Sequence, residues 1–201
     1  QNKTTFVIGI VSRLTRQKGF NLLAPVIESF LTYTKAQLIV VGTGDTEIMD
    51  FFKTLETKFP DQVRAHLQFD ETLPRLIYAG GDIVLIPSRF EPSGLTQMEA
   101  MRFGAVPVAR RVGGLADTVE DYIPEENSGT GFLFDEFDPI ALLIALIRSF
   151  VNWLHRPAWR ELQRRVMEKD FSWDRSAREY VTLFEKAVAI HRQELDKETR
   201  T

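Results

Sequence analysis

The chain has 201 residues, a formal net charge of −3, 44 % hydrophobic residues and no cysteine. This size and composition suit one domain with an apolar core, and the charge argues against a nucleic-acid or anionic-membrane surface. The absence of cysteine excludes disulfides, thiolate metal sites and cysteine nucleophiles, and favours a cytoplasmic location.

Metal and membrane sites are also disfavoured. The three histidines, His66, His155 and His191, lie far apart in the sequence, so we expect no histidine metal site. No run of about 18 apolar residues occurs, so we expect no membrane span. The chain opens with a short polar segment that lacks a signal-peptide pattern, and a strand pattern follows at once. We therefore expect the chain to be part of a longer protein.

Apolar, β-branched runs alternate with segments of helical apolar spacing along the first two thirds of the chain. In chain order, the pattern predicts a strand at 6–11, a helix at 20–31, a strand at 37–41, a helix at 46–59, a strand at 63–69, a helix at 73–79, a strand at 82–86, a helix at 94–103, and strands at 106–109 and 132–134.

After Asp138 the pattern predicts helices only, at 140–154, from Pro157 onward and at 173–191. Short buried strands that alternate with helices are typical of a parallel sheet covered on both faces. We therefore predict a single doubly wound, Rossmann-like α/β domain over 1–201 that ends in helices. Ligands in such sheets bind beyond the carboxyl ends of the strands, and the unusual polar residues of this chain follow strand ends.

The loop after the first predicted strand carries Arg13 and Lys18, five positions apart, and then Gly19. A loop can direct both cations to one anion, and glycine permits a tight backbone path into the next segment. The alternative is a basic loop exposed to solvent. The position of the loop at the ligand-binding edge favours the anion site.

The segment 87–99 is the most specific pattern, and it joins the fourth predicted strand to a helix. Ser93 is a candidate N-cap for this helix. The backbone N–H groups of Gly94, Leu95 and Thr96 would then be free at the helix start, where the helix dipole also favours an anion. This segment therefore predicts a phosphate-binding turn.

Two carboxylates flank the predicted helix start. Glu99 lies three residues beyond Thr96 on the same helix face, and its side chain leans back toward the N-terminus. Because a carboxylate repels a phosphate, we expect Glu99 to accept hydrogen bonds from sugar hydroxyls. Glu91 precedes the helix and can reach the same cavity from the loop. The alternative is a surface Glu91 and a Glu99 that only stabilises the helix.

Three further features are less specific. Gly113 and Gly114 follow the fifth predicted strand and suit either a backbone approach to a ligand or an ordinary turn into a helix. The segment 42–44 has two glycines but lacks the third glycine of the dinucleotide fingerprint, because Glu47 stands there, which argues against an NAD site. Phe69 ends the third predicted strand and either stacks on a nucleotide base or belongs to the core.

Three motifs in this order resemble the retaining glycosyltransferases of the two-domain GT-B class, and most closely the glycogen and starch synthase family. They are Ser12-Arg13-Leu14 with Lys18-Gly19, the segment 87–97, and Gly113-Gly114-Leu115-Ala116-Asp117-Thr118. The first two motifs also resemble sucrose synthases and mannosyltransferases, whereas Asp117-Thr118 favours the glycogen synthase group.

The resemblance implies the C-terminal, donor-binding half of such an enzyme, with ADP-glucose or UDP-glucose as the nucleotide-sugar donor and no cofactor or metal. The α-glucan acceptor would bind through an N-terminal domain that is absent from this chain. We expect neither a nucleic-acid nor a membrane partner. Two alternatives stay open: the donor domain of another retaining GT-B transferase, of sucrose or mannosyl type, and a non-catalytic binding module.

The resemblance also implies roles for single residues. Arg13 and Lys18 match the cations that hold the donor diphosphate. Glu91 matches the glutamate beside the donor sugar, and Glu99 the one toward the ribose. The other implied donor-binding residues are Gly94, Leu95, Thr96 and Phe69. Tyrosine is common in the family at the position of Phe69.

Overall fold

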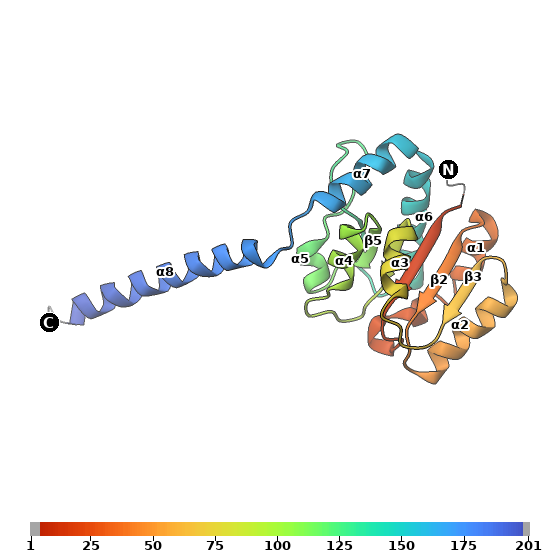
Figure 1. Ribbon diagram of the computed structural model, residues 1–201, viewed down its shortest axis with the longest axis horizontal. Coiled ribbons are helices and arrows are strands. Elements are labelled where there is room, and N and C mark those ends of the chain that lie inside the picture. The colour runs from red at the N-terminus through yellow and green to blue at the C-terminus, as the bar shows by residue number, and fades with distance from the viewer. Residues whose placement is uncertain (1–4, 199–201) are drawn as a thin grey trace. The chain divides into compact units, whose positions relative to one another are not determined.

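The computed structural model describes the backbone of residues 5–198 and the side chains up to residue 192. The chain divides into two compact units between Glu168 and Lys169. The first unit contains a sheet with its helices, and the second contains one long helix (Figure 1).

The sheet of the first unit has six strands, all paired in parallel, in the order β3-β2-β1-β4-β5-β6. This is the order of a doubly wound sheet, and its direction of winding switches between β1 and β4. The predicted fold class is therefore confirmed. The strands are β1 (Val7–Val11), β2 (Gln37–Val41), β3 (Val63–His66), β4 (Ile83–Ile86), β5 (Val106–Arg110) and β6 (Phe132–Phe134).

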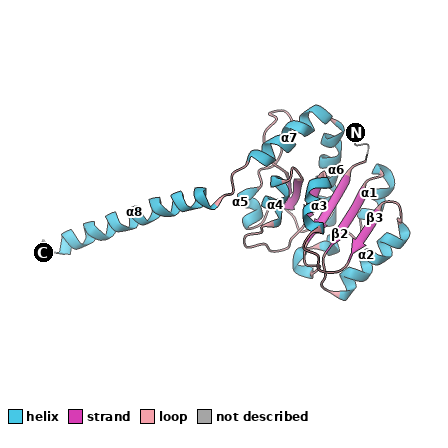
Figure 2. Cartoon of the chain, in the orientation of Figure 1, coloured by secondary structure: helices cyan, strands magenta, loops and turns pink. Residues whose placement is uncertain are grey.

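The strands are apolar because both faces of the sheet are covered. Every residue of β4 is buried, and so are Ile8 and Ile10 of β1. The covering helices are α1 (Ile27–Thr34), α2 (Thr46–Lys58), α3 (Leu73–Gly80), α4 (Thr96–Arg102), α5 (Gly114–Thr118), α6 (Pro139–Leu154) and α7 (Arg156–Glu168) (Figure 2).

The helices form two layers. On one side, α3 packs on β1 and β2 and contacts α4, which in turn contacts α5 and α7. On the other side, α6 packs on β5 and β6 and contacts α1. The carboxylate of Asp138 begins α6 by accepting hydrogen bonds from the backbone N–H groups of Ile140 and Ala141, at 2.8 and 3.2 Å.

The predicted helix 20–31 is wrong in its middle. A short 3₁₀ helix, η2 (Phe20–Leu22), ends before Pro25, and α1 begins only at Ile27. Proline has no backbone N–H to donate, so a continuous helical ladder does not cross this position. The same loop region contains a second 3₁₀ helix, η1 (Arg16–Lys18), which carries Lys18 of the first motif, whereas Arg13 precedes it.

The predicted strand 63–69 is too long, because β3 ends at His66. The carboxylate of Asp70 accepts hydrogen bonds from the backbone N–H groups of Thr72 and Leu73, at 2.8 and 2.6 Å, and so turns the chain into α3. These bonds hold the pKa of Asp70 below its usual value. Phe69 therefore lies in a loop, and its side chain is 78 % exposed, so the expectation that it belongs to the core is wrong.

The predicted start of the helix 94–103 is also wrong. Gly94 has a φ of 72°, in the left-handed region, and α4 begins at Thr96 after Leu95 as its N-cap. Ser93 is therefore not the N-cap. The segment 93–95 is a glycine turn that leads into α4.

The second unit contains α8 (Trp173–Glu198), which is amphipathic. Val181, Phe184 and Val188 recur at helical spacing along it. No helix in the described part of the chain is long and apolar enough to cross a membrane.

An aromatic cluster packs at the amino-terminal end of the sheet. The ring of Phe6, just before β1, makes edge-to-face contacts with Phe150, Trp153 and Trp159, at centroid distances of 5.6, 5.3 and 6.4 Å. Trp159 also stacks on Phe132 at 6.2 Å. The cluster joins α6 and α7 to the sheet, at the end opposite to the strand-end loops that carry the motifs.

Replacing Trp159 with alanine is expected to lower the free energy of unfolding by about 3–5 kcal/mol, because it leaves a cavity where a 2 % exposed side chain was packed. Trp159→Phe is the control, since the indole N–H of Trp159 has no hydrogen-bond partner in the described part of the chain. Denaturant unfolding followed by circular dichroism measures both. Equal stabilities of the two variants would contradict this account of the cluster.

Candidate functional site

The loops that follow β1 and β4 lie side by side at the switch point of the sheet. The backbone N–H of Arg89 donates to the carbonyl of Gln17 at 2.8 Å, and the side-chain amide of Gln17 donates to the carbonyl of Phe90 at 3.2 Å. Strands β1 and β4 are themselves paired. The first two motifs are therefore joined to each other by hydrogen bonds.

Gly19 allows this close approach. A Cβ atom on residue 19 would lie 1.9 Å from the carbonyl oxygen of Pro87, and the φ of 75° is one that other residues rarely adopt. The glycine is needed for backbone-to-backbone packing, as well as for the turn that the sequence predicts.

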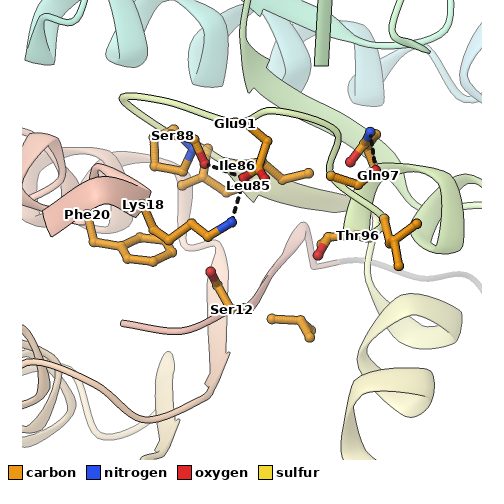
Figure 3. A pocket seen from close by; sticks show the side chains of 13 residues that line it. Ser12, Lys18, Phe20, Leu85, Ile86, Ser88, Glu91, Thr96 and Gln97 are labelled. Carbon is orange, nitrogen blue, oxygen red and sulfur yellow. Dashed lines mark hydrogen bonds and ion pairs between the residues drawn. The ribbon is translucent and has the colours of Figure 1, made fainter. Parts of the chain in front are cut away.

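The first cavity at this edge has a volume of about 300 Å³. Figure 3 shows Lys18 and Glu91 extending toward each other across it, with Ser88 beside Glu91. The cavity is lined by Val11, Ser12, Lys18, Phe20, Leu85, Ile86, Pro87, Ser88, Glu91, Gly94, Leu95, Thr96 and Gln97.

Glu91 is held by two donors on one oxygen. Its Oε2 accepts from the ammonium of Lys18 at 2.5 Å and from the hydroxyl of Ser88 at 3.1 Å. The side chains of Lys18 and Glu91 are only 17 % and 9 % exposed, and Ser88 is buried. A charge pair with so little solvent around it is costly to break by removing one partner. The geometry therefore fixes one cation and one carboxylate in the same cavity.

The turn at Gly94 forms another part of the cavity lining. In the described part of the chain, the backbone N–H groups of Gly94, Leu95 and Thr96 donate to no other protein group. The side-chain amide of Gln97 donates to the carbonyls of Ser93 and Gly94, at 3.2 and 2.9 Å. The carbonyls of this turn are thus engaged within the protein, while its amides stay available for an anion.

A second cavity, of about 340 Å³, adjoins the first. Both are lined by Val11, Ser12 and Thr96. The other residues of the second cavity are Arg13, Val41, Gly42, Thr43, Gln68, Phe69, Asp70, Pro74, Tyr78 and Glu99. It therefore extends from the end of β1 toward the loop after β3.

Tyr78 and Glu99 line the second cavity together. Tyr78 is buried, and burial raises the pKa of its hydroxyl well above the usual value, with a further rise from the Glu99 carboxylate. The hydroxyl therefore stays protonated at neutral pH. The side chain of Glu99 provides oxygens that can accept hydrogen bonds from a polyol.

The structure distributes the predicted site residues over the two cavities. The first contains Lys18, Glu91, Gly94 and Leu95, the second contains Arg13, Glu99 and Phe69, and Thr96 lines both. Arg13 and Lys18 were expected at one pocket and instead line two that adjoin. The exposed ring of Phe69 is available for stacking. The roles of these residues stay predictions.

Sequence reasoning did not assign roles to Ser88, Tyr78 or Gln97. Ser88 and Gln97 are buried and lie within the segment 87–99, so their position in the sequence beside Glu91 and Gly94 could have indicated a role in the site. Tyr78 had none, because it reaches the site from α3 in the preceding crossover.

The paired glycines of the third motif do not line either cavity. A Cβ atom on Gly114 would lie 1.9 Å from the carbonyl oxygen of Ser93, and one on Gly113 would lie 2.0 Å from that of Glu91. Of the two expectations for these glycines, a backbone approach to a ligand is therefore not the one seen. They approach the backbone of the Glu91 loop instead.

The glycines of the segment 42–44 serve similar packing. Cβ atoms there would meet the carbonyl oxygens of Ser12 and Leu14, at 1.8 and 2.2 Å. Among the described residues, no group of three or more His, Asp or Glu side chains has the arrangement of a metal site.

The chain matches the family described as glycosyl transferases group 1 over residues 1–166. It belongs to this family. The match covers the whole sheet and both cavities.

The chain is similar to proteins named glycogen synthase. It is 46 % identical to the one of Thermotoga maritima over 189 residues, which is 94 % of this chain and 39 % of that protein. It is 42 % identical to the one of Trichodesmium erythraeum, over 94 % of this chain and 41 % of that protein. The chain thus spans about two fifths of the relatives that it matches.

A solved structure supports the same placement. The catalytic domain of starch synthase IV from Arabidopsis thaliana, bound to ADP and acarbose, matches with a TM-score of 0.81 at 37 % identity. The match covers 94 % of this chain and 39 % of that one. The fold is therefore that of one Rossmann-like half of a GT-B enzyme.

Gly19→Ala is expected to lower the free energy of unfolding by more than about 1 kcal/mol, because the new methyl group collides with the carbonyl of Pro87. Gly80→Ala is the matched control, since a Cβ atom there meets nothing within 4 Å. Thermal unfolding of the two variants tests the packing of the first two loops. A Gly19 variant as stable as the Gly80 variant would contradict it.

Proposed function

We propose that this chain is the donor-binding domain of a glycogen or starch synthase, which transfers glucose from ADP-glucose or UDP-glucose to the non-reducing end of an α-1,4-glucan with retention. One observation carries the proposal: two adjoining cavities at the switch point combine two cations, three carboxylates and free backbone amides. Identities of 42 and 46 % to proteins named glycogen synthase support this enzyme class.

The first cavity suits the diphosphate and the sugar. When the bond between the anomeric carbon and the diphosphate breaks, negative charge grows on the leaving phosphate. The ammonium of Lys18 and the backbone amides of the Gly94 turn lie where they can bind that charge. Two unit charges about 4 Å apart interact by about 4 kcal/mol at an effective dielectric of about 20, and each 1.4 kcal/mol or so is tenfold in rate. Charge stabilisation of this size is enough to matter for catalysis.

Arg13 would add to this stabilisation from the second cavity. Its exposed side chain lines that cavity together with Thr96, which also lines the first. A diphosphate that spans the shared wall would lie between Lys18 and Arg13. We therefore assign the two cations to opposite sides of one diphosphate.

Glu91 has two possible roles in a retaining transfer. A double displacement needs a carboxylate nucleophile beside the anomeric carbon, and Glu91 is the carboxylate that lines the first cavity. In the alternative, the acceptor attacks from the same face as the leaving phosphate, which takes the acceptor proton. Because Lys18 and Ser88 both hold Oε2 of Glu91, we favour the second role, in which Glu91 positions the sugar and stabilises positive charge on it.

The second cavity suits the nucleoside. Glu99 would accept hydrogen bonds from ribose hydroxyls, and the exposed ring of Phe69 would stack on the base. Base–aromatic stacking contributes about 1–3 kcal/mol in nucleic-acid systems. No cofactor or metal is needed beyond the nucleotide-sugar.

The alternatives are less favoured. A sucrose- or mannosyl-type transferase would use the same donor geometry, but the relatives reported above are named glycogen and starch synthases. A non-catalytic module would leave the Lys18–Glu91 pair and the Glu99 carboxylate without a common purpose. The cytoplasmic location stays a prediction.

Nucleoside diphosphates should bind this chain weakly, with ADP or UDP preferred over GDP. Lys18→Met should weaken the binding about ten- to hundredfold, since a charge-assisted hydrogen bond is lost. Glu91→Gln should leave it unchanged or tighten it, because the carboxylate that competes for Lys18 is gone. Isothermal titration calorimetry measures all three. Absence of binding by the unmodified chain would support the non-catalytic module, and a GDP preference would support a mannosyl relative.

The chain alone is expected not to elongate an α-glucan, because the acceptor is proposed to bind through another domain. Incorporation of labelled glucose into glycogen measures this. In a full-length enzyme that contains this domain, Glu91→Gln should abolish most turnover while nucleotide binding persists. Robust elongation by the isolated chain, or near-normal turnover of the Gln variant, would show that the assignment is wrong.

A further inference from the structure

The third motif makes no contact with either cavity, yet it is tied to the segment that does. The backbone N–H of Gly114 donates to the carbonyls of Glu91 and Pro92, at 3.1 and 3.2 Å. The close approach of Gly114 to the carbonyl of Ser93 adds direct packing. The path of the Glu91 loop is therefore set by contact with the start of α5.

A chain of hydrogen bonds makes a second connection. The side-chain amide of Gln97 donates to the hydroxyl of Thr118 at 3.0 Å, and this hydroxyl donates to the carbonyl of Gly114 at 2.5 Å. The same amide donates to the carbonyls of Ser93 and Gly94. The one amide of Gln97 therefore contacts both the glycine turn and α5. Hydrogen bonds linked in such a chain strengthen one another.

The opposite end of the Gln97 side chain has no partner among the residues that the structure describes. Its Oε1 is buried and accepts no hydrogen bond from them. A buried polar atom without a partner costs stability, so a glutamine is a poor choice for packing alone. What the glutamine supplies over an apolar residue of equal length is an amide whose two hydrogens are shared among the carbonyls of Ser93 and Gly94 and the hydroxyl of Thr118.

We propose that Gln97 and Thr118 are positioning residues for donor binding: they brace the segment 91–95, so that its turn and the Glu91 carboxylate face the first cavity. The brace rests on the proposed function, because it acts through groups that would bind the diphosphate and the sugar. The brace also gives the third motif a function, although none of its residues lines either cavity.

The test compares nucleoside diphosphate affinity with fold stability. Thr118→Val and Gln97→Met remove the brace with little change in shape. Each should weaken binding of the preferred nucleoside diphosphate by at least about fivefold, the effect of one lost hydrogen bond. Thr118→Ser keeps the hydroxyl and should restore affinity. The double variant Gln97→Met/Thr118→Val should lose less than the product of the two single effects, because the two residues share a bond.

Thr130→Val is the matched control. The buried hydroxyl of Thr130 accepts a hydrogen bond from the backbone N–H of Glu120 at 2.9 Å, away from both cavities. This variant should lower the melting temperature but leave nucleotide affinity unchanged. Calorimetric titration and thermal unfolding of all variants provide the two readouts.

Three results would overturn the brace. The first is nucleotide affinity of Thr118→Val and Gln97→Met equal to that of the unmodified chain. The second is a loss of affinity in Thr130→Val as large as its loss of melting temperature would predict from the other variants. The third is an affinity of Thr118→Ser no higher than that of Thr118→Val. A failure of the unmodified chain to bind any nucleoside diphosphate would instead overturn the proposed function, and the brace with it, because nothing would then need positioning.

Discussion

The site depends on contact between backbones that belong to different strand-end loops. The carbonyl oxygen of Pro87 occupies the space that a side chain on residue 19 would need, and the carbonyl oxygen of Ser93 occupies that of residue 114. Parallel strands end at one edge of a sheet, so their loops must either diverge or pack together. Here glycine lacks the side chain that would keep the loops apart. The loop after β4 therefore packs between the loop after β1 and the loop after β5.

This packing explains why charged side chains from two different loops meet. Lys18 comes from the loop after β1 and Glu91 from the loop after β4, and they form a nearly buried pair at 2.5 Å. The charges that line the first cavity therefore balance. In the proposed function, a donor diphosphate would pair with the Lys18 ammonium in place of the Glu91 carboxylate. Glu91 would then be free to face the sugar.

The sequence predicted the parallel sheet well, because Val- and Ile-rich runs such as β4 are buried on both faces. It also predicted which loops line the two cavities, since Gly19 and Gly94 stand beside charged residues at strand ends. It failed where one local interaction decided the outcome. Pro25 divides a predicted helix, and Asp70 turns the chain before Phe69 can join a strand.

Distance along the chain explains the other failures. The contact of Tyr78 with Glu99 and the bond between Gln97 and Thr118 join different elements, and spacing along one strand or helix carries no trace of them. Paired glycines likewise look the same whether they approach a phosphate or another backbone. For Gly113 and Gly114, three-dimensional packing was needed to choose between the two.

The two cavities share only Val11, Ser12 and Thr96. Selection can therefore act on them almost independently. Exchange of Phe69, Gln68 or Pro74 alters the wall of the second cavity and leaves the Lys18–Glu91 pair of the first untouched. If the two cavities bind the nucleoside and the diphosphate as proposed, a lineage could change its nucleotide while it keeps the groups around the bond that breaks, which suits a scaffold that is reused for many sugar donors.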